Sequence, residues 1–327
     1  MRIISVIIIL LLFVQSAIGQ YNLDYGIKLG AANYLGEMGG TSKEGKGTPA
    51  KGFISDLRFD KTRYCFGAWV RYKVHPLLSV KANLGVIRIT GADSLSDYAN
   101  RKGRNLSFRN DLVELNAQFE YNFYTAQDIT SRGKTRMDFG TFVFIGGGMF
   151  WNNPKAKYEG KWVALQPLGT EGQGRIQKEN NKGEMEDFKK YKRIVAMLHG
   201  GLGLHYTIKR KYRIGWETAV RYTFTDYIDD VSDRYAPAGT FDSDADSKAE
   251  DLANNSDYAD VMTNGVVQPS QYSPGSLRGN PKKNDWYMTM EFTFGYVVRG
   301  KSNFYRSKYK FITGAKKRRK RKTRAKF

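Results

Sequence analysis

Apolar and polar residues alternate in eight separate stretches of the chain, and a period of two predicts β-strands. In the clearest stretch, Leu115 stands on one face, between Glu114 and Asn116 on the other. The eight predicted strands cover residues 23–31, 64–74, 78–86, 113–123, 139–150, 194–206, 214–224 and 286–298. In residues 139–150 both faces are apolar, so the pattern leaves the register of that strand open.

The connections between these strands alternate in length. Those after the second, fourth and sixth strands are shorter, and those after the first, third, fifth and seventh are long. A transmembrane barrel with an even number of antiparallel strands has short turns at one end and long loops at the other. The chain is therefore predicted to be all-β, an eight-stranded antiparallel transmembrane β-barrel with long outer loops, and with short turns and both termini in the periplasm.

A soluble β-sandwich or a lipocalin-like cup also has alternating strands. In such a cup the apolar face would line a cavity, whereas in a membrane barrel it would face lipid. The sequence alone does not say which face is outside. Aromatic residues near the predicted strand ends are typical of a membrane-interface belt and favour the membrane barrel. These aromatic residues are Tyr25, Tyr72, Tyr121, Phe123, Tyr222, Phe224, Trp286 and Tyr296.

Eight strands leave an interior that side chains fill, so the charged face is predicted to form a hydrogen-bonded plug without a conducting pore. We expect ions of both signs to pair there. The predicted lumenal residues are Lys28, Arg71, Lys81, Glu114, Glu120, His199, His205, Glu217, Arg221 and Glu291.

The composition excludes several kinds of site. One cysteine cannot form an internal disulfide, a thiolate zinc site or a CxxC redox pair, and three histidines leave little material for a metal centre. His199 and His205 lie six residues apart on one strand face, about 20 Å from each other, so they cannot act as one catalytic pair. No GxSxG motif is present. We expect no catalytic residue, no metal and no cofactor.

Residues 1–19 are predicted to be a cleavable signal peptide, with Arg2 before an apolar run and Ala17 and Gly19 at the positions that a signal peptidase recognises. The alternative is an N-terminal membrane anchor, but Gln15 and Ser16 interrupt the run too early for one. Residues 20–299 then form the predicted barrel, and residues 300–327 a basic periplasmic tail that is disordered when unbound.

The tail is the strongest local charge signal in a chain of net charge +21, since residues 299–327 contain 14 Lys and Arg and no acid. A periplasmic location excludes nucleic acid as its ligand, which leaves anionic lipid or an acidic protein partner. The predicted partner-binding residues are Arg306, Lys308, Lys310, Lys316, Lys317, Arg318, Arg319, Lys320, Arg321 and Lys322.

The longest connection is acidic. Residues 226–260 contain 11 acids and two bases, and we expect a solvated outer loop there, with loose divalent-cation binding as the alternative. The run that starts at Asp242 has Ser247 and Ala253 where a calcium-binding EF-hand loop needs Gly and Glu, which excludes an EF-hand.

Five stretches carry a family resemblance. They are AANYLGE (31–37), RITGADS (88–94), NPK (153–155), WVALQPLGTEGQG (162–174) and FTDYIDDVS (224–232). In this order they resemble the PorG-like outer-membrane barrels of the Bacteroidetes type IX secretion system, over roughly residues 21–299. The basic tail exceeds what the family pattern requires.

The resemblance implies a non-enzymatic accessory subunit of type IX protein secretion, located in the bacterial outer membrane. Its implied partners are the periplasmic ring lipoprotein and that lipoprotein's partner subunit, together with outer-membrane lipid. Two other functions stay open at this point. One is a structural or adhesive barrel that binds external ligands through its loops, and the other is an outer-membrane enzyme that hydrolyses lipid or peptide.

Overall fold

The structure is a computed structural model that describes residues 23–36, 38, 59–75, 77–96, 99–127, 137–179, 184–209, 211–241, 246–254, 262–263, 266–267 and 272–298. Eight long strands dominate it. They are β1 (Leu23–Leu35), β2 (Arg63–His75), β3 (Leu78–Ala92), β4 (Ser107–Gln127), β5 (Met137–Trp151), β10 (Ile194–Ile208), β11 (Tyr212–Thr223) and β14 (Trp286–Val298). Each overlaps one predicted strand. The first residue of β1 and the last residue of β14 lie within the predicted barrel range, residues 20–299.

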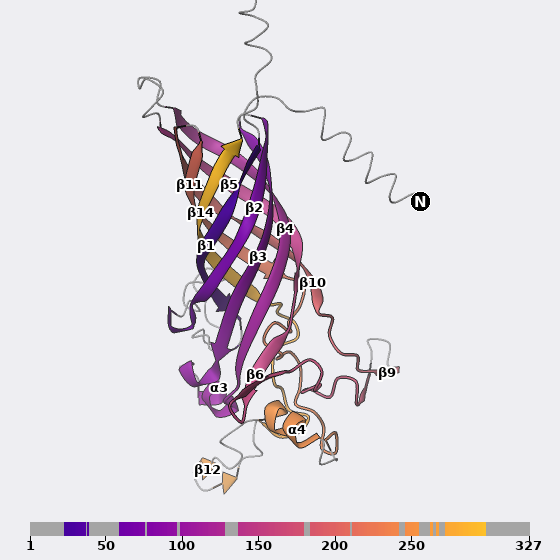
Figure 1. The fold of residues 1–327 in the computed structure, drawn as a ribbon. Helices are drawn as coiled ribbons and strands as arrows, with labels where there is room; N and C mark the ends of the chain where they lie inside the picture. Colours follow the sequence, from indigo (N-terminus) through magenta and orange to yellow (C-terminus); the bar gives the residue numbers. More distant parts are fainter. Residues whose placement is uncertain are drawn as a thin grey trace, which may run out of the picture.

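These strands form one closed antiparallel barrel (Figure 1). Neighbours along the chain pair with one another, β14 pairs with β1, and the β3–β4 pair leaves the ring without an open edge. Closure gives the backbone N–H and C=O groups of every strand hydrogen-bond partners on both neighbouring strands. Hydrocarbon offers such groups no partner. The predicted eight-stranded transmembrane barrel is therefore confirmed as the fold class.

The two ends of the barrel differ. The short connections β2–β3, β4–β5 and β10–β11 lie at one end, together with the start of β1 and the finish of β14, and we call it the turn end. The four long connections lie at the opposite end, the loop end (Figure 1). Among the described residues, no helix has the length and apolar character that crossing a membrane requires.

The loop end contains most of the short elements. They are η1 (Phe59–Lys61), η2 (Asp93–Leu95), α3 (Ala99–Arg104), β6 (Pro154–Tyr158), β7 (Lys161–Ala164), β8 (Gln177–Glu179), β9 (Met185–Asp187), α4 (Ser247–Ala253), β12 (Met262–Thr263) and β13 (Val266–Val267). β6 pairs with the first part of β4 and β7 pairs with β6, so this hairpin extends the barrel wall beyond β5.

Burial along β4 shows which face is outside. Leu115 is 55% exposed and Phe119 is 67% exposed, whereas Glu114 and Glu120 are each 1% exposed. The apolar face therefore points outward and the charged face points inward, which is the reverse of a soluble barrel. This arrangement excludes the lipocalin-like cup.

Two aromatic girdles border the apolar outer surface. At the turn end they include Tyr25, Tyr121, Phe123, Tyr206, Tyr212 and Tyr296, and at the loop end Tyr64, Trp151, Phe224 and Trp286. From Trp286 to Tyr296 the chain covers about 33 Å along β14, which corresponds to a height of roughly 25 Å at the usual strand tilt. That height matches the hydrocarbon band of an outer membrane, and the chain has the architecture of an outer-membrane barrel.

The structure also fixes the register that the sequence left open. Phe142 and Phe144 of β5 point inward and are buried, opposite Gly203 and Gly201 of β10. A Cβ atom at Gly203 would lie 2.3 Å from the Phe142 ring, so the missing side chains make room for the two rings. Aromatic rings commonly cover strand glycines in this way.

We predict that a charge in the middle of the apolar belt destabilises the barrel. Ile145→Arg, at a side chain that is 68% exposed halfway along β5, should lower the free energy of unfolding by about 2–4 kcal/mol. Urea unfolding in lipid vesicles, followed by tryptophan fluorescence, measures the loss. Leu277→Arg is the matched control, because Leu277 is 63% exposed at the loop end outside the belt. Equal losses for the two variants would contradict the membrane position of β5.

Candidate functional site

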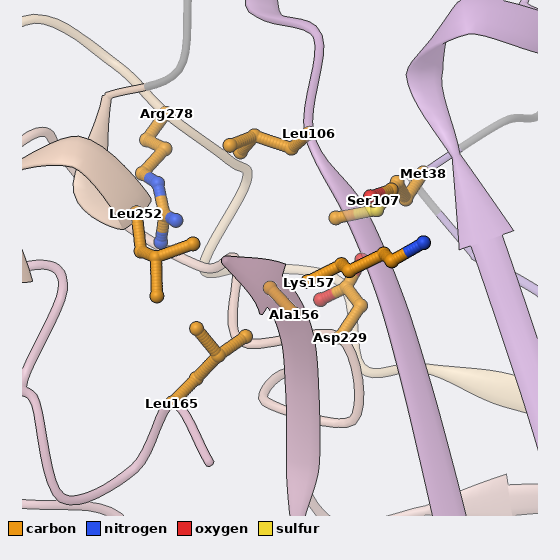
Figure 2. Close-up of a pocket in the computed structure, with 9 residues that line it drawn as sticks. All are labelled: Met38, Leu106, Ser107, Ala156, Lys157, Leu165, Asp229, Leu252 and Arg278. Atoms are coloured by element: carbon orange, nitrogen blue, oxygen red, sulfur yellow. The ribbon is translucent and has the colours of Figure 1, made fainter. Parts of the chain in front are cut away.

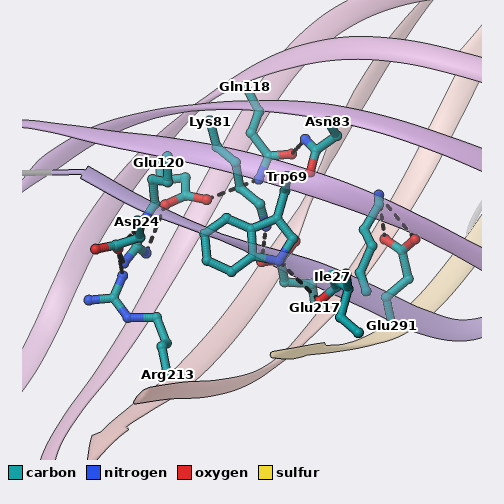
Figure 3. A network of polar contacts seen from close by, with 12 residues as sticks. Asp24, Ile27, Trp69, Lys81, Asn83, Gln118, Glu120, Arg213, Glu217 and Glu291 are labelled. Atoms are coloured by element: carbon teal, nitrogen blue, oxygen red, sulfur yellow. Dashed lines mark hydrogen bonds and ion pairs between the residues drawn. The ribbon is translucent and has the colours of Figure 1, made fainter. Parts of the chain in front are cut away.

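The barrel interior contains a network of ion pairs. Arg71 donates to Asp24 at 2.5 Å and to Glu120 at 3.3 Å, and Arg213 also donates to Asp24. Lys81 pairs with Glu217 in the middle of the lumen. In Figure 3 the Trp69 indole lies between the Asp24–Glu120 group and Glu291.

A second group of lumenal pairs is formed at β1, β4, β11 and β14. Lys28 pairs with Glu291 at 3.1 Å, and Arg221 pairs with Glu114 at 2.8 Å. The Tyr287 hydroxyl also donates to Glu114 at 2.8 Å. Together the two groups contain five cations and five carboxylates, and we call these ten residues the lumenal network.

The structure brings eight of the ten predicted lumenal residues into these pairs. The other two, His199 and His205, also face the interior, but they lie next to uncharged side chains. His199 Nε2 lies 3.4 Å from Gln118 Oε1, and the His205 ring lies 5.7 Å from the Phe142 ring. Within the described residues, the Nδ1 atom of each histidine has no hydrogen-bond partner, so neither is held by the carboxylate that a catalytic triad needs.

The sequence reasoning missed several members of the interior. Asp24 and Arg213 complete the charge balance, but Arg213 lies just before the predicted seventh strand. The polar side chains Asn83 and Gln118 are joined by a 3.1 Å hydrogen bond. Trp69 breaks the alternation because its ring occupies space next to Gly295, and its Nε1 donates to the Ile27 carbonyl at 3.2 Å. The signal for Asp24 is its register, because the pairing of β1 with β2 places it opposite Arg71.

A second polar assembly closes the loop end. Its centre is Arg278, which donates to Glu171 at 3.2 Å and to the Asp230 carbonyl at 2.6 Å. The Asp230 carboxylate accepts hydrogen bonds from Thr170 at 2.5 Å and from Tyr191 at 2.6 Å. All of these side chains except Tyr191 are buried. They join the β5–β10 connection to the β11–β14 connection, and we call the five residues, with Tyr34, Asp229 and Asp285, the cap.

The remaining cap residues attach the connections to the strands. The Tyr34 hydroxyl lies 2.8 Å from Asp229 Oδ2 and 2.5 Å from Asp285 Oδ1. The Tyr34 hydroxyl therefore lies between two buried carboxylates. Burial raises the pKa of Asp285 well above its ordinary value, and the neighbouring Asp229 and Asp226 carboxylates raise it further.

Two asparagines connect the cap to the barrel wall. Asn110 of β4 donates to the Asn152 side chain at 2.5 Å and to the Ile228 carbonyl at 2.8 Å. Asn152 in turn donates to the Tyr227 carbonyl at 2.8 Å. Both asparagines are fully buried, so these bonds satisfy backbone groups that water does not reach.

A small cavity lies beside the cap. It has a volume of about 30 Å³, room for about two water molecules, and Arg278 and Asp229 line it together with Leu165 and Leu252 (Figure 2). Among the described residues no cluster of three or more His, Cys, Asp or Glu side chains has the arrangement that a metal ion needs.

The expectation that residues 226–260 form a solvated loop is wrong for the first part of the segment. Asp226, Asp229 and Asp230 are buried, and the cap supplies donors that replace water at Asp229 and Asp230. Asp246 pairs with Arg175 at 2.7 Å, Ser247–Ala253 form α4, and residues 242–245 lie outside the described residues. The predicted signal peptide and the basic tail also lie outside them.

Comparison with known proteins gives a partial match. A family model described as "Domain of unknown function (DUF6089)" matches residues 1–161. No curated protein matches the sequence. Among solved structures, the N-terminal β-barrel domain of Pseudomonas aeruginosa OprF is 9% identical, with a TM-score of 0.31, and the match covers 85% of this chain and 99% of that chain. Ail, the attachment invasion locus protein of Yersinia pestis, is 8% identical, with a TM-score of 0.29, over 84% of this chain and 98% of that chain.

The lumenal network is tested by a double-mutant cycle. Lys81→Met leaves Glu217 buried without its partner and should lower the free energy of unfolding by about 3–5 kcal/mol. Adding Glu217→Gln should recover a large part of this loss. Lys211→Met, at an exposed residue of the turn end, is the control and should cost less than about 0.5 kcal/mol. Urea unfolding in vesicles of the wild type, Lys81→Met, Glu217→Gln and the double variant completes the cycle, and strictly additive losses would contradict the pairing.

The cap should loosen as the pH rises. Burial raises the pKa of Asp230 from 3.8 to about 6, so between these values the folded cap holds a proton that the unfolded chain releases. Its stability therefore falls from about pH 4 to pH 6, by on the order of 2–3 kcal/mol. The raised pKa of Asp285 adds to this fall, which starts at the same pH. Hydrogen exchange of residues 152–193, corrected for intrinsic rates, should show the loss of protection.

Two substitutions separate the contributions. Asp230→Asn and Asp285→Asn should each make the fall with rising pH shallower, because each removes one carboxyl group whose pKa is raised in the cap. Asp233→Asn is the control, because Asp233 is only partly buried and pairs with an exposed lysine. A cap that becomes more protected as the pH rises would contradict the raised pKa values.

Proposed function

We propose that this chain is a non-enzymatic accessory subunit of the type IX protein secretion machinery, which tethers the periplasmic ring to the outer membrane. The observation that carries the proposal is the filled lumen. Ion pairs and aromatic rings occupy the space through which a solute or a protein would have to pass. A barrel of this kind supports an anchoring role better than a conducting one.

The assignment to type IX secretion depends on the resemblance to PorG-like barrels. The stretches that carry it are distant in sequence, yet three of them bond to one another in the cap. Tyr34 of 31–37 contacts Asp229 of 224–232, and Thr170 and Glu171 of 162–174 bond Asp230 and the Ser232 N–H. The stretches therefore belong to one folded unit, which supports treating them as one family feature.

The turn end supplies the tethering surface in this proposal. β14 ends at Val298, and the chain leaves the barrel at the same end as the short turns. The basic tail thus starts on the side that faces the periplasm if the barrel has the usual orientation. Its 13 cations in residues 300–327 suit an acidic surface of the ring lipoprotein or of that lipoprotein's partner subunit.

Deleting residues 300–327 tests the tether. We expect the shortened chain to reach the outer membrane and to lose the ring lipoprotein and its partner subunit in pull-downs from solubilised membranes. Lys282→Gln with Lys283→Gln removes two cations at the loop end and serves as the charge control, which should keep both partners. Unchanged recovery after the deletion refutes the tail as the contact, whereas absence of both partners from the full-length pull-down refutes the secretion role itself.

A further inference from the structure

The outer face of the barrel carries a group of cations on one side of the loop end. These are Arg88 of β3, Arg109 of β4, and Lys155 and Lys157 of β6, and we call them the basic rim. The tail does not contribute to it, and neither the lumenal network nor the cap uses these side chains. The four cations lie next to the apolar belt and are therefore available to a ligand.

Strand pairing places these four side chains on the outer face. Arg88 follows Leu84 and Val86 at a period of two, so it shares their lipid-facing side. Arg109 lies four residues before Val113 on β4, so it shares the lipid-facing side of Val113. Lys155 is paired with Arg109. Paired residues lie on the same face of a sheet, and the rim therefore continues from β3 across β4 to β6.

The rim lies at the level where lipid headgroups begin. Val113 of β4 is paired with Val86 of β3 and with Trp151 of β5, and these three belong to the upper edge of the apolar belt. Arg88 and Arg109 come two and four residues beyond that edge on their strands. A rise of about 3.3 Å per residue puts them roughly 7–13 Å further along the strands, where hydrocarbon gives way to headgroups.

Aromatic rings hold the two guanidinium groups. Arg88 lies 5.0 Å from the centre of the Tyr64 ring, and Arg109 lies 4.2 Å from the centre of the Trp162 ring. A guanidinium group that stacks on a ring keeps the N–H donors at its edge free for an anion. Trp162 is 43% exposed, so the stacked pair is accessible from outside.

The donors of the rim exceed the acceptors near it. Asp111 is the one acid at its centre, and it accepts Arg88 Nε at 2.5 Å and Arg88 Nη2 at 3.2 Å. Arg109 Nε lies 3.7 Å from Asp111 and has no hydrogen-bond partner within the described residues. Four cations against one carboxylate leave a local charge of about +3, and the ammonium groups of both lysines pair with no described carboxylate.

The opposite side of the barrel has a different rim. The outward residues at the loop end of β11 and β14 are Tyr222 and Trp286, which are paired with each other, and Phe224 follows them. The Trp286 and Tyr222 rings meet edge to face at 4.8 Å, and no cation joins them among the described residues. This aromatic edge therefore differs from the rim, where Arg88 and Arg109 each lie against a ring.

We propose that the basic rim binds the phosphate groups of a lipid headgroup in the leaflet at the loop end. Arginine and lysine are the residues that recognise phosphate, and arginine does so with two parallel N–H donors. The apolar belt directly below the rim would contact the acyl chains of the same molecule. With the turns in the periplasm, that leaflet contains lipopolysaccharide, whose lipid A carries phosphate, and the occupant is therefore a phosphorylated lipid A.

Native mass spectrometry of the full-length chain in detergent tests the site, with bisphosphorylated lipid A as the probe. The wild-type chain should bind it at least roughly tenfold more tightly than enzymatically dephosphorylated lipid A. The variant Arg88→Gln/Arg109→Gln/Lys155→Gln should lose the same factor. Lys282→Gln with Lys283→Gln removes exposed cations elsewhere at the loop end and should bind as the wild type does.

Three results would overturn the proposal. They are equal binding of the phosphorylated and dephosphorylated lipid, unchanged binding by the triple variant, and displacement of the lipid by an equal concentration of inorganic pyrophosphate, which would indicate a site for free anions. If the triple variant fails to form the heat-resistant barrel on a gel, Lys157→Glu decides the question. Lys157 is exposed, so this variant should fold. It should bind lipid A at least about threefold more weakly than the wild type does.

Discussion

The structure depends on mutual neutralisation of charge inside a closed barrel. Once the apolar residues of each strand face lipid, the alternating residues must point inward, and many of them are ionic. A buried ion without a partner costs several kcal/mol, so the interior is stable only when cations and carboxylates are matched. The lumenal network meets this condition with five of each, and glycines such as Gly201 and Gly203 leave space for the aromatic rings that fill the remainder.

Buried charges are also paired in the cap, beyond the membrane-spanning part of the barrel. The cap buries Arg278 with Glu171 and Asp230, and it turns two long connections into one folded unit. Asn110 and Asn152 then attach this unit to β4. The lumenal network and the cap are therefore two paired polar assemblies of one folded unit, one inside the apolar belt and one beyond it.

The strands could be predicted from sequence because lipid imposes a strict period of two. The prediction began too late on β4, at residue 113 against the observed Ser107, because Arg109 and Asp111 lie beyond the lipid and their side chains on the outer face are charged. The cap could not be predicted. Arg278 and Glu171 are 107 residues apart, and a pair at that separation leaves no local pattern. Trp69 escaped the pattern for another reason, since its partner Gly295 lies on a strand that closes the barrel.

The length of β4 has a mechanical consequence. Residues 107–112 continue about 20 Å past Val113 while they remain paired with β3 and then with β6. A force applied to the folded connections would run along this strand into the barrel wall. Such a force would load the backbone hydrogen bonds of β4 with β3 and β6 at once in shear, so β4 mechanically couples the loop-end connections to the membrane-spanning wall.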